Sequence, residues 1–129
     1  METLSAVTNP SSPSEIVVVD NDLRVLRRST EIIIKLGWYP RTFSKPSHAL
    51  EYIFEANKRV HTLLIELTTP GSRSGCEVAI IVADKFPSIR VIAMSEALDI
   101  YLQLSPEVDF IPKPWSLKSL SKILGVSRS

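Results

Sequence analysis

Short apolar runs alternate along this chain with segments that have the 3.6-residue period of an α-helix. Strands are expected at 16–19, 39–43, 62–67, 89–95 and 108–112. Five helices are expected between and after them, the fourth of them over 97–104. Strands that are apolar on both faces occur in sheets covered on both sides. The alternation therefore predicts a five-stranded parallel sheet in a doubly wound α/β domain.

Residues that favour helix ends mark where the expected helices begin and stop. Asp20 or Asn21 is expected to cap the first helix, and Gly37 to follow its last turn. Pro46 opens the second helix, and Ser116 caps the last one. The helical period turns twelve side chains inward: Leu23, Leu26, Ile33, Leu36, Ala49, Leu50, Ile53, Phe54, Leu117, Leu120, Ile123 and Leu124.

The expected third helix, from about 76 to 86, holds more apolar residues than one inward stripe can use. We expect its outer face, near Ile80, to meet a protein partner or a second copy of the chain. Cover by the N-terminal tail is the alternative.

The length of 129 residues suits one domain. Ser, Thr and Pro dominate residues 1–14, a composition that predicts a flexible N-terminal tail. Residues 15–125 are expected to form the folded domain, and 126–129 a short C-terminal tail. The hydrophobic fraction of 44% excludes disorder as the state of the whole chain.

Charge and cysteine content exclude further classes. Fifteen Lys and Arg against fourteen Asp and Glu leave +1, without the basic excess of nucleic-acid or membrane-surface binders. The single cysteine, Cys76, permits no intramolecular disulfide and is interpreted as a structural thiol. No apolar run reaches the roughly 18 to 20 residues of a spanning helix, and the start has no secretory pattern. We therefore expect a cytoplasmic protein.

Other polar residues suggest no site. Four basic residues recur at helical spacing in the first helix and are interpreted as a solvated face: Arg24, Arg27, Arg28 and Lys35. His48 and His61 lie in different elements, without the spacing of transition-metal ligands.

Polar residues follow the expected strands where each one ends. The first strand is followed by Asp20, Asn21 and Asp22, and the third ends near Glu66. Ser95 and Lys113 end the fourth and fifth strands, but Asp22 is interpreted as a helix cap. Doubly wound sheets bind their ligands at the carboxyl ends of the strands, so a site is expected there.

Four segments carry this pattern in detail: VVVDND at 17–22, the stretch 36–50, LLIELTTPG at 63–71 and FIPKPW at 110–115. In this order they resemble the receiver domain of two-component response regulators, over about residues 15–125. The resemblance implies a flavodoxin-like receiver fold with strand order 2-1-3-4-5.

The resemblance also implies roles for the acidic strand ends. In receivers, an aspartate after the third strand accepts a phosphoryl group from a histidine kinase, and two acidic residues after the first strand hold Mg²⁺. Glu66 occupies the phosphoacceptor position, and its carboxylate reaches about 1.5 Å further than that of an aspartate. The metal positions match Asp20 and the neutral Asn21, so Mg²⁺ binding is expected to be weakened and no cofactor is predicted.

Three further positions match the family. The hydroxyl that binds the phosphoryl oxygen matches Ser95, the aromatic switch residue matches Phe110, and the lysine matches Lys113. Only eighteen positions separate Ser95 from Lys113, fewer than the family pattern has, so the fourth helix is expected to be short.

These departures favour a stand-alone atypical receiver, a pseudo-receiver that acts in two-component or phosphorelay signal transduction by protein–protein interaction. It is expected to have no enzymatic activity and to bind a histidine kinase, a phosphotransfer protein or another receiver, with a homodimer as a further option. Neither nucleic acid nor a membrane is an expected partner.

Alternatives stay open. The chain could be a functioning Mg²⁺-dependent phosphoacceptor, or a phosphomimetic variant of one, since Ser95 and Lys113 are retained. Glu66 could imitate the phosphorylated state or lock the inactive one, and it could be natural or engineered. A flavin-binding domain is disfavoured, because the turn after the first strand is acidic and has no Gly, Ser or Thr cradle for a phosphate.

Overall fold

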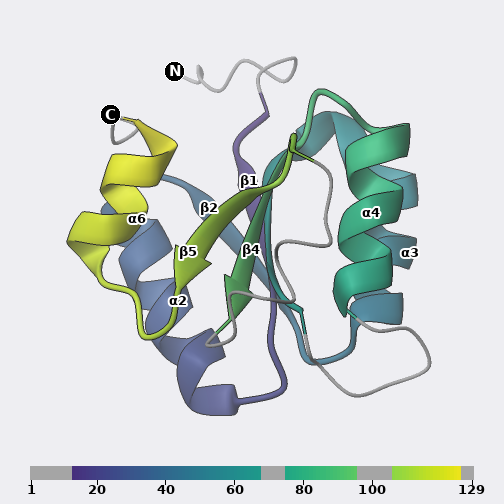
Figure 1. Cartoon of the computed structure of the whole chain (residues 1–129). Coiled ribbons are helices and arrows are strands. Elements are labelled where there is room, and N and C mark those ends of the chain that lie inside the picture. Colours follow the sequence, from purple (N-terminus) through teal and green to yellow (C-terminus); the bar gives the residue numbers. More distant parts are fainter. Residues whose placement is uncertain (1–12, 68–74, 96–105, 126–129) are drawn as a thin grey trace, which may run out of the picture.

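The computed structural model describes residues 13–67, 75–95 and 106–125, and it has a five-stranded parallel sheet at its centre (Figure 1). The strands are β1 (Glu15–Val19), β2 (Tyr39–Phe43), β3 (Val60–Glu66), β4 (Arg90–Ser95) and β5 (Asp109–Pro112). Their order is β2-β1-β3-β4-β5, and all four pairings are parallel. The predicted doubly wound sheet with order 2-1-3-4-5 is confirmed.

Helices cover both faces of this sheet, α2 and α6 on one and α3 and α4 on the other (Figure 1). The described helices are α2 (Leu23–Lys35), α3 (Pro46–Ala56), α4 (Gly75–Lys85) and α6 (Leu117–Leu124), with a 3-10 turn, η1 (Asn57–Arg59), before β3. The helix expected at 97–104, and with it the shortened fourth helix, lies outside the described residues. None of the described helices is long and apolar enough to cross a membrane.

Alternate residues of the central strands supply two separate cores. Ile16 and Val18 of β1 pack with Leu64 of β3 beneath α2 and α6, and Val17 and Val19 point to the α3 and α4 side. All of these side chains are fully buried. Strands buried on both faces read as continuous apolar runs, which is why the sequence pattern identifies them.

The helix ends differ from the prediction at one point. Asp22 caps α2, because its side chain accepts a hydrogen bond from the Arg24 backbone N–H at 2.9 Å. Of the residues considered as caps, Asp22 is therefore the right one, and Asp20 or Asn21 is not, because the Asp20 carboxylate binds the Asp22 backbone N–H and the Lys113 side chain instead. The predicted Ser116 cap is confirmed, and Gly37 has the positive φ of 89° that a residue after a helix requires.

Three residues predicted to face inward are exposed. Leu23 and Leu117 are the first residues of their helices, before a full turn has formed against the core, and they are 66% and 41% exposed. Phe54 is 50% exposed and lies edge-on against Phe86, with ring centroids 5.2 Å apart. The other nine inward residues are buried or partly buried.

Backbone hydrogen bonds of the fold extend to Ser14, one residue before the predicted start of the domain at residue 15. The Ser14 backbone N–H donates to the Arg59 carbonyl at 3.1 Å, and its carbonyl accepts from the Tyr39 N–H at 3.0 Å. Residues 1–12 and 126–129, the greater part of the two predicted tails, lie outside the described residues.

Candidate functional site

The parallel strands bring the predicted site residues to one edge of the sheet. Asp20 follows β1 directly, Glu66 is the last residue of β3, and Ser95 is the last residue of β4. Lys113 follows β5, and its backbone N–H donates to the Ser95 carbonyl at 3.2 Å. Residues up to 93 positions apart in the sequence therefore meet at the carboxyl end of the sheet.

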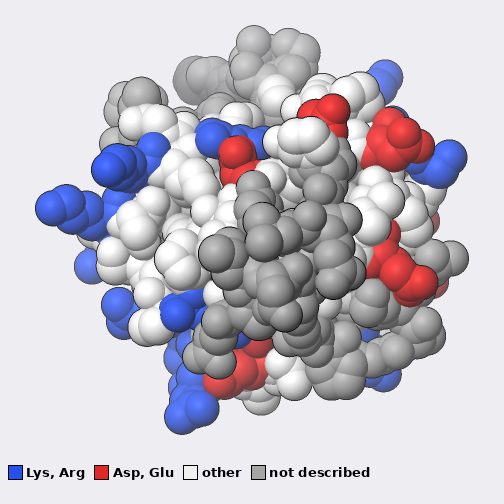
Figure 2. All heavy atoms as spheres, in the orientation of Figure 1, with Lys and Arg blue, Asp and Glu red and all other residues white. Residues whose placement is uncertain are grey.

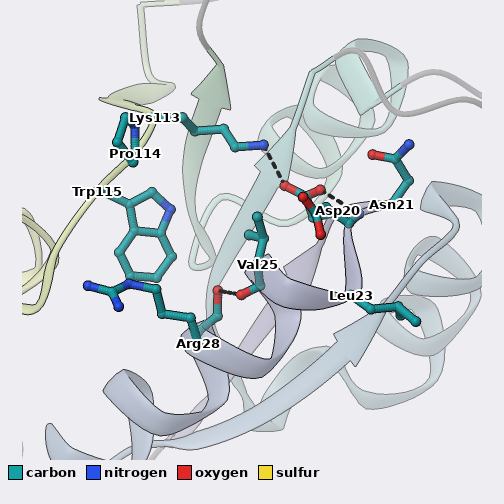
Figure 3. A pocket seen from close by; sticks show the side chains of 10 residues that line it. Asp20, Asn21, Leu23, Val25, Arg28, Lys113, Pro114 and Trp115 are labelled. Atoms are coloured by element: carbon teal, nitrogen blue, oxygen red, sulfur yellow. Dashed lines mark hydrogen bonds and ion pairs between the residues drawn. The ribbon is translucent and has the colours of Figure 1, made fainter.

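The Lys113 ammonium lies between two buried carboxylates. Its Nζ atom is 2.8 Å from Oδ2 of Asp20 and 2.6 Å from Oε1 of Glu66, and Figure 3 shows the side chain reaching across to Asp20. The side chains of Asp20 and Glu66 are 1% and 8% exposed, and that of Lys113 is 17% exposed. Two carboxylates share one cation, so this triad carries a formal charge of −1.

Burial and ion pairing act in opposite directions on Lys113. Burial by itself lowers the pKa of the ammonium, because a charged group loses solvation. The hydrogen bonds and the charges of Asp20 and Glu66 outweigh burial and raise the pKa above its ordinary value. Lys113 therefore stays protonated and ties β5 to the ends of β1 and β3.

The remaining polar residues after β1 point away from the triad. Asp22 caps α2 and forms an ion pair with the Arg24 side chain at 3.2 Å. The side-chain and backbone hydrogen bonds from Arg24 lower the pKa of the Asp22 carboxyl. Asn21 is exposed, and its amide points away from Lys113 (Figure 3). The preferred interpretation of Asp22 as a helix cap is confirmed.

This arrangement does not fit a Mg²⁺ site. Mg²⁺ requires oxygen ligands in near-octahedral geometry. Of the acidic groups here, Asp20 and Glu66 both bind the Lys113 ammonium, while Asp22 is committed to the helix end and Arg24. Within the described ranges, no group of three or more His, Cys, Asp or Glu is placed to hold a metal ion.

Ser95 and Phe110, the other two predicted residues, lie in different surroundings. Ser95 is 2% exposed at the end of β4, and it contacts the triad through the backbone hydrogen bond to Lys113. Phe110 is partly buried in β5 and packs against the core on the α3 and α4 side. Of the predicted residues, the structure therefore brings the side chains of Asp20, Glu66 and Lys113 into direct contact. Ser95 joins them through its backbone carbonyl.

A glycine just before the expected third helix, which sequence analysis did not single out, is part of this edge. Gly75 is the first residue of α4, and a Cβ atom built on it would lie 1.9 Å from the Glu66 carbonyl oxygen. The next residue, Cys76, donates its backbone N–H to the Leu67 carbonyl at 3.2 Å. Only glycine fits this approach, so α4 begins directly against the strand end that carries Glu66.

A groove beside the triad was also missed. It encloses about 780 Å³ between α2 and the connection from β5 to α6. Leu23 and Arg28 line one wall, Pro114 and Trp115 the other, and Asp20 and Lys113 lie at its end (Figure 3). The available signal in the sequence was the tryptophan of the FIPKPW segment. In the structure its indole Nε1 donates to the Met94 sulfur at 3.1 Å, and the ring forms part of this wall.

Comparisons with known proteins agree on the fold. No protein-family model matches the chain, and no curated protein matches it by sequence. The chain is similar to the response regulator TrrA from Thermotoga maritima, solved in complex with Mg²⁺ and BeF. The identity is 21% over 86% of this chain and 96% of that one, with a TM-score of 0.77.

Two further solved structures are similar. A response regulator receiver domain protein from Clostridium thermocellum is 18% identical, over 84% of this chain and 89% of that one, with a TM-score of 0.75. A CheY-like receiver domain protein from Methanospirillum hungatei is 19% identical, over 88% and 91%, with a TM-score of 0.74. The chain therefore has the fold of response-regulator receiver domains, as its motifs indicated.

Proposed function

We propose that this chain is an atypical receiver domain of two-component signalling that acts by binding protein partners and is not phosphorylated at Glu66. The observation that carries the proposal is the contact of the Lys113 ammonium with both Glu66, at 2.6 Å, and Asp20, at 2.8 Å. The carboxylates that would attract a metal and the ammonium that would attract a phosphoryl group are bonded to one another within the chain, which leaves a formal charge of only −1.

The chemistry of phosphoryl transfer supports this proposal. The nucleophile must be aligned with the phosphorus, and a misplacement of about 1 Å can cost on the order of 10²-fold in rate. Glu66 carries one methylene more than aspartate, and its carboxylate is 8% exposed and bonded to Lys113. Asn21 supplies no charge for Mg²⁺, which normally offsets the repulsion between carboxylate and phosphate.

A receiver of this kind holds one conformation. Lys113 joins the end of β5 to the ends of β1 and β3 without a phosphate. In this proposal the surface formed by β5 and α6 is fixed, and partners recognise it constitutively. Suitable partners are a histidine kinase, a phosphotransfer protein or another receiver in the cytoplasm, and the domain needs no catalytic activity of its own.

The competing function is that of a phosphoacceptor controlled by Mg²⁺. It draws support from Ser95 and Lys113, which stand at the carboxyl ends of β4 and β5 where a phosphoryl group would need a hydroxyl and a cation. In that case Lys113 would exchange its contact with Glu66 for one with the phosphoryl oxygens.

A titration with Mg²⁺ and then beryllofluoride, an acyl-phosphate mimic, separates the two functions. Amide NMR shifts of Ser95, Phe110 and Lys113 are followed in the parent, in Glu66→Asp and in Glu66→Gln as the matched control. We expect no saturable shift in the parent or in Glu66→Gln. A Mg²⁺-dependent, saturable shift in the parent would contradict the proposal.

The Glu66→Asp variant identifies why the parent shows no saturable shift. A shift in this variant alone would mean that the extra methylene of Glu66 prevents the response. No shift in either the parent or Glu66→Asp would mean that Asn21 also prevents the response. Asn21→Asp in the Glu66→Asp background should then restore the shift.

A further inference from the structure

The two helical layers of this domain carry opposite charge. On α2 and α6 there are six basic residues and one acidic residue: Arg24, Arg27, Arg28, Lys35, Lys118 and Lys122, with Glu31. On α3 and α4 there are four acidic residues and one lysine: Glu51, Glu55, Glu77 and Asp84, with Lys85. Figure 2 shows Lys and Arg gathered on the α2 and α6 side. The net charge of +1 hides this separation.

The acidic layer also exposes apolar side chains. Phe54 on α3 is 50% exposed and Ile80 on α4 is 45% exposed. The Phe54 ring rests edge-on against Phe86, which follows α4, so apolar side chains of both elements contribute to this side of the molecule. We call this surface, with the four acidic residues beside it, the acidic face.

The basic layer exposes a matching set on α2. Leu23 is 66% exposed and Ile34 is 58% exposed. Eleven residues make about three helical turns, so the two lie on the same side of α2, roughly 16 Å apart, with Arg27 between them. We call Leu23, Arg27, Ile34 and the neighbouring Lys35 the basic face.

We propose that the acidic face of one copy binds the basic face of a second copy, head to tail. Each face pairs exposed apolar groups with charges that are mostly of one sign, with Glu31 the exception on the basic side and Lys85 on the acidic side, and the chain carries both members of the pair. The two faces lie on opposite sides of the sheet, so one molecule cannot join them within itself (Figure 1). A contact between two different patches leaves one face free on each end and extends into a ring or a chain.

The physical contributions to this contact are separable. Burial of Phe54, Ile80, Leu23 and Ile34 supplies the non-directional attraction. The opposite charges steer the approach and set the orientation, and salt screens them. Because the net charge is only +1, general repulsion between copies is weak. Association should therefore rise with protein concentration and fall as salt is added.

The test uses sedimentation velocity on the full chain over a range of concentrations, at low salt and at 0.5 M NaCl. The acidic-face variant is Phe54→Ser with Ile80→Ser, and the basic-face variant is Arg27→Gln with Ile34→Ser. The matched control is Lys122→Gln with Leu117→Ser, which removes one lysine and one exposed apolar side chain from α6. Circular dichroism verifies that each variant is folded.

We expect the parent and the control to form concentration-dependent assemblies that salt weakens at least several-fold, and each face variant alone to be monomeric. Each face variant keeps the face that the other lacks. An equimolar mixture should therefore form dimers of one copy of each variant and nothing larger.

Three results would overturn the proposal. A parent that is monomeric at all concentrations would mean that another occupant, such as the N-terminal tail, covers the acidic face. A symmetric dimer that only the acidic-face variant abolishes would mean that this face binds itself. A mixture that stays monomeric would mean that the two faces do not pair. Glu66→Asp should assemble like the parent, which keeps this test independent of the proposed function.

Discussion

The two ends of the sheet each hold a buried carboxylate next to β1, and they satisfy it differently. At the amino end, Glu15 accepts a hydrogen bond from the Tyr52 hydroxyl and lies 3.4 Å from Arg41 and 3.5 Å from Arg59. At the carboxyl end, Asp20 and Glu66 share the single ammonium of Lys113. In these contacts the amino end has two cations for one carboxylate, and the carboxyl end has one cation for two carboxylates.

The cations also differ in exposure. Arg41 and Arg59 are 53% and 59% exposed, so water screens their interaction with Glu15. Lys113 is only 17% exposed, and its ammonium binds both carboxylates at the carboxyl end. At the amino end two exposed arginines can therefore replace each other, whereas at the carboxyl end one largely buried ammonium joins two carboxylates.

The largest effect is expected from Lys113→Met. The substitution removes the ammonium that both buried carboxylates bind, and loss of one partner from a buried pair costs about 3–5 kcal/mol. Urea unfolding followed by circular dichroism measures the loss. The double variant Lys113→Met with Glu66→Gln should recover at least half of it, because one negative charge is removed. A loss below about 1 kcal/mol would contradict the role of the Lys113 ammonium in holding the carboxyl end of the sheet together.

Gly75→Ala tests how tightly the carboxyl end is built. The added Cβ would lie 1.9 Å from the Glu66 carbonyl oxygen, so backbone must move, at a cost of about 2–3 kcal/mol. Gly125→Ala is the control, since Gly125 has a φ of 96° but nothing within 4 Å of the added atom. Its cost should be about 1 kcal/mol, from backbone strain alone. Equal losses in thermal unfolding would mean that α4 does not press on the Glu66 strand end.

Sequence patterns were sufficient for the sheet and for the polar residues that meet at its carboxyl edge. Five apolar runs predicted five strands, and the polar residues after them predicted which side chains meet at the carboxyl edge. Glu66 and Lys113 lie 47 positions apart, and each was placed at this edge by the motif that contains it. Strand ends are forced together by parallel pairing, so a local pattern is enough to place them.

The remaining features depend on contacts that no local pattern reports. The burial of Glu15 depends on Arg41, Tyr52 and Arg59, which lie 26 to 44 residues later. Nothing in the sequence marks Gly75, because the Glu66 carbonyl that an added Cβ would meet comes close to it only in the folded structure. Leu23 fitted the helical period and is exposed all the same, because the first turn of α2 extends beyond the core.

Glu15→Gln measures the redundant amino end. The amide keeps an oxygen that can accept the Tyr52 hydroxyl, so the expected cost is the loss of two exposed ion pairs, about 1–2 kcal/mol in urea unfolding. Arg41→Gln and Arg59→Gln should each cost less than about 1 kcal/mol, because the other arginine remains. If either single arginine variant matched Lys113→Met, the contrast between the two ends would fail.

The smallest effect is a pH dependence confined to the carboxyl end. The hydrogen bonds to Asp20 and Glu66 overcome burial and raise the pKa of Lys113 in the folded state, so the native protein holds this proton more tightly than the unfolded chain does. Its stabilisation is complete below the unfolded pKa of about 10.4 and is lost as the pH rises through the higher native pKa.

The free-energy difference between the parent and Lys113→Met, from urea unfolding at each pH, should therefore be constant from pH 7 to about 9.5 and shrink above about 10.4. Lys58→Met is the control, because Lys58 on η1 is exposed and forms no ion pair within the residues that the structure describes. Its difference from the parent should stay small at every pH. A Lys113→Met difference that persists unchanged to pH 11 would show that packing of the lysine stem, and not its charge, holds the carboxyl end of the sheet together.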